Sequence, residues 1–333
     1  MKAIILFIMR YTRQEIFSEI RKDGQLKLGK SSVAIVGLGA LGSVSSELLA
    51  RAGIGHLILI DRDVVELSNL QRQSLYNESD VGKPKAVAAK EHLIKINSEI
   101  KINSIIDDLN HENIGKILKN PALILDCTDN LETRFLINDF SIKNKTPFIY
   151  SSAIGSKGYV FNIIPNKTAC LKCFLKDANA LDTCETAGVL NSITHLISSI
   201  QSNEAIKILL KKDYENNLLF FNVWKNELTK IKINKLKNCE CCAKNNFEYL
   251  SGKKKSSLIK MCGSNIFQIN NKTMNKKQFR EIKSKLKNIG KIIDFGNCIN
   301  FQNRITLFDD GRALIKAKDE KEAKSLYSKF IGN

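Results

Sequence analysis

The sequence lacks a hydrophobic run long enough to cross a membrane, which takes about 20 apolar residues. The nearest candidate is the apolar run 3–8 behind Lys2. That run is shorter than the core of a signal peptide, which spans about 7–15 residues, and no small-residue cleavage site follows it. We therefore expect a cytoplasmic protein with no membrane partner, whose chain begins at Met1 or at Met9.

Histidine and acidic residues are also scarce. The four histidines show no paired spacing, so we treat them as ordinary residues. The 34 acidic residues face 52 lysines and arginines, a net charge of +18, and residues 251–333 alone hold 19 basic against 7 acidic residues. This excess can attract an acidic partner, or it can reflect a Lys/Asn-rich composition on solvated faces. Because aromatic and basic residues do not interleave there, we expect no nucleic-acid partner.

Cysteine, by contrast, is plentiful. In a cytoplasmic chain, nine cysteines favour metal ligands or nucleophiles over disulfides. Two C-x-x-C pairs predict a closed tetrahedral zinc site with four cysteine ligands, which is structural and not catalytic: Cys170 with Cys173, and Cys239 with Cys242. The alternative is four unrelated free thiols. Three further cysteines lie in apolar runs and are predicted to be small core residues: Cys127, Cys262 and Cys298.

The most informative stretch is 33–42. Its first four residues are apolar and predict a buried parallel strand, and a glycine run then leads into a predicted helix. The run has the G-x-G-x-x-G spacing at Gly37, Gly39 and Gly42, which lets a backbone approach phosphates closely at a helix N-terminus. Asp61 ends the next apolar run, where a carboxylate suits a ribose hydroxyl. The stretch therefore predicts a nucleotide site.

The residues that follow Asp61 distinguish between nucleotides. Ser68, Asn69 and Arg72 form a polar cluster, and Lys85 comes at the start of the next predicted helix. A guanidinium offers a planar fork to phosphate oxygens and an ammonium a compact charge. This much positive charge suits a triphosphate better than a nicotinamide, and we find no acid–base pair that an NAD-dependent oxidoreductase would need.

Asp129 ends the fourth predicted strand, in the run Asp126-Cys127-Thr128-Asp129-Asn130. Ligands of open α/β sheets sit at the carboxyl ends of the strands, so this carboxylate could hold Mg²⁺ bridging phosphates. The alternative is that Asp129 caps the helix predicted for 131–143. The residues alone leave the two roles open.

The alternation of apolar runs and helical patterns predicts a doubly wound parallel sheet. Strands are expected at 33–36, 57–60, 100–105, 122–126 and 147–150, alternating with helices at 43–52, 83–96, 110–118 and 131–143. A strand at 155–164, a long helix at 189–210 and an antiparallel pair at 218–223 and 228–233 follow. Residues 10–22 are expected to be helical, and 24–31 a linker.

Residues 258–333 predict a small α+β module behind a linker at 252–255. Its expected strands are 266–269, 291–295, 305–308 and 313–317, and its helices 276–287 and 319–330. Asp309-Asp310-Gly311 is expected to form a tight primed turn. The fold class is thus α/β, a Rossmann-like doubly wound and mostly parallel sheet with an antiparallel extension, a four-cysteine zinc site and a C-terminal α+β module. We place the domains at 9–250 and 256–333.

These motifs together resemble the ThiF/MoeB/HesA family of adenylyltransferases, which activate ubiquitin-like sulfur carrier proteins. The resemblance covers roughly 9–245 and rests on GLGALG, Asp61, SNLQRQ, VGKPK, DCTDN, the two cysteine pairs and the preceding RYTRQ. The residues after about 255 lie outside the family pattern, and they lack the rhodanese domain that some relatives carry.

The resemblance implies ATP, Mg²⁺ and structural Zn²⁺, and a carrier ending in Gly-Gly as partner. Contacts to the nucleotide would come from Gly37, Gly39, Ala40, Gly42, Asp61, Ser68 and Asn130. Binding of the triphosphate and Mg²⁺ would fall to Asn69, Arg72, Lys85 and Asp129. Arg13 would reach across a homodimer into the partner's site, and Cys184 matches a loop cysteine that either acts as a nucleophile or is a bystander. Ala40 departs mildly from the family, which often has Gly there.

The implied reaction joins the carrier's C-terminal glycine carboxylate to the α-phosphorus of ATP and releases pyrophosphate, in thiamine or molybdopterin synthesis. The protein's task is positioning and charge neutralisation. Two alternatives remain: an NAD-dependent oxidoreductase, and a scaffold that kept the fold but lost activity. The presence of Asn69, Arg72, Lys85 and Asp129 argues against the scaffold.

Overall fold

The computed structural model describes residues 10–175, 188–254, 266–270, 274–296 and 298–332. The chain divides into two compact units, 1–255 and 256–333, which are described separately. Among the described residues, no helix is long and apolar enough to cross a membrane.

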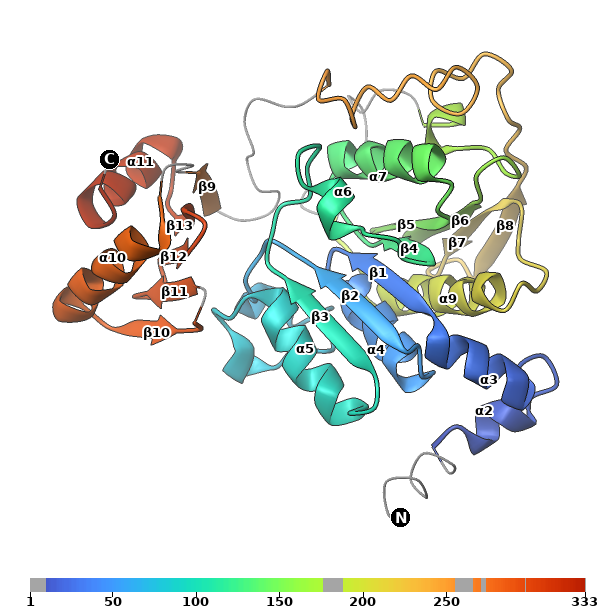
Figure 1. Ribbon diagram of the computed structural model, residues 1–333, viewed down its shortest axis with the longest axis horizontal. Coiled ribbons are helices and arrows are strands. Elements are labelled where there is room, and N and C mark those ends of the chain that lie inside the picture. Colours follow the sequence, from blue (N-terminus) through green and yellow to red (C-terminus); the bar gives the residue numbers. More distant parts are fainter. Residues whose placement is uncertain (1–9, 176–187, 255–265, 271–273, 297, 333) are drawn as a thin grey trace. The chain divides into compact units, whose positions relative to one another are not determined.

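The first unit is built on an eight-stranded sheet of order β3-β2-β1-β4-β5-β6-β7-β8 (Figure 1). The strands of its parallel half are β1 (Ser32–Val36), β2 (His56–Ile60), β3 (Lys101–Ile105), β4 (Leu123–Asp126) and the start of β5 (Phe148–Ile154). The antiparallel half continues from β5 through β6 (Lys157–Ile163), β7 (Leu218–Asn222) and β8 (Glu227–Ile231). The predicted mixed sheet is therefore confirmed.

Helices cover both faces of this sheet, as Figure 1 shows. One core packs beneath α4 (Gly42–Arg51), α5 (Lys85–Ile96) and α9 (Asn191–Leu209). The other packs beneath α6 (Ile114–Ile117) and α7 (Leu131–Asn144), and it extends to the cysteine pairs. Because β1 and β4 are buried on both faces, their sequences are apolar runs rather than alternating patterns, apart from Ser32 at the start of β1 and Asp126 at the end of β4.

Two expectations for this unit are wrong in detail. The supposed linker 24–31 belongs to α3 (Arg21–Lys30), which follows the short α2 (Thr12–Ile16). Gln25 is buried there and donates a hydrogen bond to the Ala52 carbonyl. The helix expected at 110–118 shortens to α6, because the side chains of Asn110 and Asn113 accept hydrogen bonds from the backbone and hold a turn.

The second unit has a five-stranded sheet of order β10-β11-β12-β13-β9. Its strands are β9 (Ile266–Asn270), β10 (Ile292–Asp294), β11 (Cys298–Phe301), β12 (Ile305–Phe308) and β13 (Arg312–Lys316). Its core packs against α10 (Lys276–Ile289) and α11 (Glu320–Phe330). β11 was not expected from the sequence, and it is only four residues long.

The turn expected at Asp309-Asp310-Gly311 also differs. Three residues separate β12 from β13, and of these only Gly311 has a positive φ, +87°. The pair of left-handed residues that a primed turn needs lies instead at Gln302 and Asn303, with φ of 52° and 53°. The β11–β12 hairpin therefore carries the primed turn, without glycine.

Candidate nucleotide site and cysteine cluster

The glycine run turns the chain where three strands of the sheet end together. Val36 pairs with Ile60 and with Asp126, so residues 37, 61 and 127 leave the sheet at one edge. Gly37 has φ +85°, and a side chain there would lie 2.7 Å from the Cys127 carbonyl oxygen. At Gly42 an added Cβ would lie 1.9 Å from the Gly37 oxygen. Glycine is required at position 37 because the turn packs against the residue that follows β4, and at position 42 because the start of α4 packs against the Gly37 carbonyl.

Gly39 has no such crowding, because the nearest atom to an added Cβ there is 3.7 Å away on Gln73. Ala40 follows it and is partly exposed. α4 begins at Gly42, so the open part of the turn precedes a helix N-terminus. This is the local geometry that suits an anionic group.

Asp61 connects this turn to the end of β2. Its Oδ2 accepts a hydrogen bond of 2.6 Å from the Leu38 amide, and its Oδ1 one of 2.7 Å from the Asp63 amide. Burial raises the pKa of Asp61 to about 6, although Lys85 and the two amides act in the opposite direction. The carboxylate thus fixes the glycine turn as well as being available to a nucleotide. The motif spacing predicted the nucleotide contact but not the role in fixing the turn.

Lys85 is the first residue of α5, and its side chain is only 9% exposed. Its Nζ lies 3.5 Å from Asp63 Oδ2. Burial acts to lower the pKa of Lys85, but the carboxylates of Asp63, Asp61 and Asp129 raise it above its usual value. Lys85 is therefore a buried cation that carboxylates keep protonated.

The polar cluster lies on a short 3-10 turn, Leu67–Asn69. Asn69 is buried, and its Oδ1 accepts a hydrogen bond from the Glu66 amide at 3.3 Å. Arg72 is partly exposed and donates to the Ser68 carbonyl at 3.0 Å. The Asn69 side chain thus stabilises the turn through its hydrogen bond with the Glu66 amide, while Arg72 presents its guanidinium at the surface.

Asp129 is exposed after β4, and Asn130 rather than Asp129 caps α7 by accepting from the Thr133 amide. The capping role left open for Asp129 is therefore wrong. Its carboxylate acts on the pKa of both Lys85 and Arg62, which places it in the same electrostatic neighbourhood. Arg13 lies exposed on α2, and Cys184 falls outside the described residues.

Two contributors were missed by the sequence analysis. Arg62 lies 3.0 Å from Asp108 and 3.7 Å from Asp63, and its position directly after Asp61 was the available signal. Tyr76 donates from its hydroxyl to the Leu38 carbonyl at 2.9 Å, and so supports the glycine turn. Nothing in the local sequence pattern marks Tyr76.

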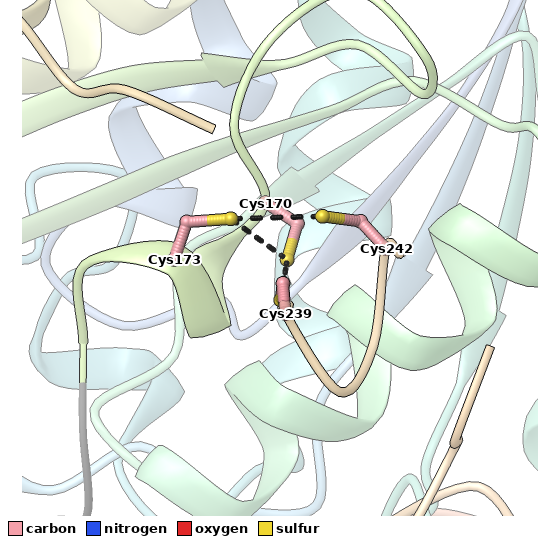
Figure 2. Close-up of side chains that lie close together, drawn as sticks. All are labelled: Cys170, Cys173, Cys239 and Cys242. Atoms are coloured by element: carbon pink, nitrogen blue, oxygen red, sulfur yellow. Dashed lines mark hydrogen bonds between the residues drawn. The ribbon is translucent and has the colours of Figure 1, made fainter. Parts of the chain in front are cut away.

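The four paired cysteines converge, as predicted. Their sulfur atoms all lie within 4.8 Å of one another, and the closest pairs, Cys170–Cys239 and Cys173–Cys242, are 3.6 Å apart (Figure 2). One pair comes from the turn at 170–173, and the other from the loop after β8. Three of the four are buried. This all-sulfur donor set could hold a metal ion, and its chemistry fits zinc in a closed structural site.

Three further cysteines were predicted to be core residues: Cys127, Cys262 and Cys298. Cys127 and Cys298 are both buried, as expected. Cys262 lies outside the described residues.

Comparison with known proteins identifies the family. Residues 11–243 match the profile of the ThiF family. The sulfur carrier protein ThiS adenylyltransferase of Bacillus subtilis is 38% identical over 97% of this chain and 99% of its own length. The molybdopterin-synthase adenylyltransferase of Escherichia coli is 36% identical over 71% of this chain and 96% of its own length.

Among solved structures, the crystal structure of E. coli MccB with ATP superposes with a TM-score of 0.62. It covers 70% of this chain and 74% of MccB at 24% identity, which supports a shared fold alone. The family evidence comes from the sequence matches. The chain belongs to the ThiF family of adenylyltransferases, as the resemblance in its motifs predicted.

Proposed function

We propose that this protein adenylylates the C-terminal glycine of a ThiS-type sulfur carrier in thiamine synthesis. The carboxylate oxygen of the carrier attacks the α-phosphorus of ATP, the bond to the β-phosphate oxygen breaks, and pyrophosphate leaves. The observation that carries the proposal is the match to the ThiS adenylyltransferase of B. subtilis over nearly the full length of both chains. The ThiS adenylyltransferase of E. coli matches 60% of this chain and the molybdopterin-synthase relative 71%, so the preference for a ThiS-type carrier rests on the B. subtilis match alone.

In this proposal the polar residues at the sheet edge bind MgATP. The open turn at Gly39 and Ala40 receives phosphate, and Asp61 binds the ribose. Asn69, Arg72 and Lys85 bind the triphosphate and stabilise the charge that develops at the α-phosphorus. Ser68 and Asn130 complete the nucleotide contacts.

Asp129 would hold Mg²⁺, which neutralises phosphate charge when bound. The exposure of Asp129 and its nearness to Lys85 support this assignment. Within the glycine run, Gly37 and Gly42 keep the turn compact rather than contacting the ligand through a side chain.

Arg13 would act in trans in a homodimer, as a cation supplied to the partner's triphosphate. Its exposure on α2 supports this, together with the exposed Ile16 and Phe17 beside it (68% and 56%). Apolar side chains left in water on a short helix are typical of an interface.

The remaining assignments complete the proposal. Cys170, Cys173, Cys239 and Cys242 bind a structural Zn²⁺, and Cys184 receives the carrier or its sulfur. The catalytic domain comprises 9–250 and a basic domain 256–333, in a cytoplasmic protein. An NAD-dependent oxidoreductase has no observation in its favour beyond the glycine run, and family membership argues against it.

Carrier-dependent exchange of radiolabelled pyrophosphate into ATP tests the function. We expect exchange with a ThiS-type carrier, none with the same carrier lacking its last two glycines, and weaker exchange with a MoaD-type carrier. Arg72→Ala should reduce exchange by about 10²-fold or more. The matched control is Arg51→Ala, an exposed arginine of α4 paired with Glu47, which should keep wild-type exchange. Full exchange by Arg72→Ala would contradict the assigned chemistry.

A further inference from the structure

A single buried amide connects the two loops that carry the cysteine pairs. Asn138, in the middle of α7, is fully buried. Its Oδ1 accepts a hydrogen bond of 2.8 Å from the amide of Leu171, which lies between Cys170 and Cys173. Its Nδ2 donates to the sulfur of Cys241 at 3.2 Å, and Cys241 lies between Cys239 and Cys242. One side chain thus bonds to both loops from the same helix.

The helix anchors the second loop again one residue later. Asp139 accepts hydrogen bonds from the Tyr249 amide at 2.9 Å and the Leu250 amide at 3.4 Å. These bonds fix the segment after the second pair, and the Asp139 carboxylate also accepts a hydrogen bond from the Cys241 thiol. Asn138 bonds to a residue inside each pair, whereas these Asp139 bonds reach only the second loop, so Asn138 is better placed to set the distance between the pairs.

The fifth thiol of the cluster also gains a role from this contact. Cys241 is fully buried beside the four converging cysteines but is not one of them. A sulfur that accepts the Asn138 N–H is held toward α7. The Cys241 thiol also hydrogen-bonds with Cys170, so it contacts both α7 and the first cysteine pair while the other four sulfur atoms converge.

We propose that Asn138 is a positioning residue for the metal site, acting through Leu171 and Cys241; this rests on metal binding by the four cysteines. Both hydrogen-bonding ends of its amide are used, and a buried amide in that state orients its neighbours firmly. Groups that orient metal ligands without touching the metal typically contribute 10–100-fold in affinity. The two loops meet from positions 69 residues apart in sequence, so their alignment must come from tertiary contacts of this kind.

Cobalt binding to the full-length protein tests the proposal. Co²⁺ reports its thiolate ligands through charge-transfer absorption, and competition with a chelator gives affinities for Co²⁺ and Zn²⁺. We expect Asn138→Ala to weaken binding by about 10–100-fold while retaining a four-thiolate spectrum. The matched control is Asn144→Ala on the same helix, whose amide donates to the Phe140 carbonyl and which should bind as wild type does.

Two further variants separate the two bonds of the amide. Asn138→Asp keeps an acceptor for Leu171 but loses the donor to Cys241, and Cys241→Ala removes that contact from the other side. We expect both to weaken binding, and their combination to weaken it no more than Asn138→Asp alone. These variants also decide the matter if Asn138→Ala does not fold.

Three results would overturn the inference. Affinities of Asn138→Ala and Asn138→Asp within twofold of wild type would show that the amide does not position the loops. An equal loss in Asn144→Ala would assign the effect to α7 in general. A wild-type protein with no thiolate–cobalt absorption would overturn the metal site itself, which is distinguishable from the other two.

Discussion

Replacing Lys85 with methionine removes the cation at the centre of the nucleotide site while keeping an unbranched side chain of similar length. The Lys85 side chain is 9% exposed, and its ammonium lies 3.5 Å from Asp63 Oδ2. At an effective dielectric constant of about 20, that separation corresponds to an attraction of roughly 5 kcal/mol. This figure does not include the cost of removing the lysine from water, which offsets part of the attraction.

The net effect on folding is smaller than this attraction. Removing one partner of a buried pair costs about 3–5 kcal/mol, because the other charge stays behind uncompensated. Asp63 is 31% exposed, so water compensates it partly and we expect a loss near the lower end, about 3 kcal/mol. For a unit of this size, that loss lowers the unfolding temperature by roughly 6–12 °C.

The loss should also depend on pH, with a sign that follows from Asp61. Burial raises the pKa of Asp61 to about 6, and Lys85 opposes that rise. Without Lys85 the pKa of Asp61 moves higher still. The variant therefore loses most stability at pH values where Asp61 and Asp63 are ionised. The difference in stability from wild type is therefore greatest above pH 7 and shrinks as the pH falls through 6.

The assay combines calorimetric unfolding at several pH values with carrier-dependent pyrophosphate exchange at a temperature where both proteins are folded. Exchange should fall by about 10²-fold or more. Lys83→Met is the matched control, because Lys83 is 27% exposed and pairs with Asp80 and Glu91 outside the proposed site. If Lys85→Met unfolds at the wild-type temperature and keeps exchange within fivefold, the buried-cation argument is wrong.

The other predictions concern residues that should affect chemistry more than stability. Asp129→Asn should fold as wild type does, since its side chain is exposed, but need far more Mg²⁺ for half-maximal exchange; an unchanged Mg²⁺ dependence would remove it from the metal site. Mixing inactive Arg13→Ala with inactive Lys85→Met should restore up to about a quarter of the activity if Arg13 acts in trans, and mixtures that stay inactive would refute that role. Cys184→Ser should leave exchange intact but abolish any covalent adduct with the carrier, as judged by mass spectrometry; loss of exchange would place Cys184 in the adenylylation step.

Much of the fold could be predicted because the parallel half of the sheet is buried on both faces. A strand such as β1, covered on each side, must be apolar at its buried positions 33–36, and four apolar residues before a glycine turn leave few alternatives. The wrong expectation at 24–31 has the opposite cause. Gly24 marks close packing, since an added Cβ would lie 3.2 Å from Ile20 and 3.4 Å from Leu210. The tertiary partners of a glycine, not its identity, decide whether it ends a helix.

The primed turn in the second unit shows the same limit. An Asp-Gly pair favours such a turn locally, yet Gly311 closes a three-residue connection instead. The β11–β12 connection also has three residues between its strand ends, so length alone does not decide which connection carries the primed turn. The register of β12 against β13, which pairs the buried Leu307 with the buried Ala313, constrains the second connection. Because side chains alternate between the faces of a sheet, a shift by one residue would expose the apolar face of β13.

At the nucleotide site the motifs identified the residues but not their partners. The motif spacing predicted a carboxylate at position 61. It did not predict the hydrogen bond that Asp61 accepts from the Leu38 amide, which forms because β1 and β2 end in register. The structure removes one of the two roles that the sequence left open for Asp129. Asn130 occupies the capping position of α7, so Asp129 has no capping bond to lose and remains exposed beside a site of buried cations. Asp129 therefore stays exposed near Lys85 and free of the capping role, which leaves its carboxylate available to the Mg²⁺ of the proposed site.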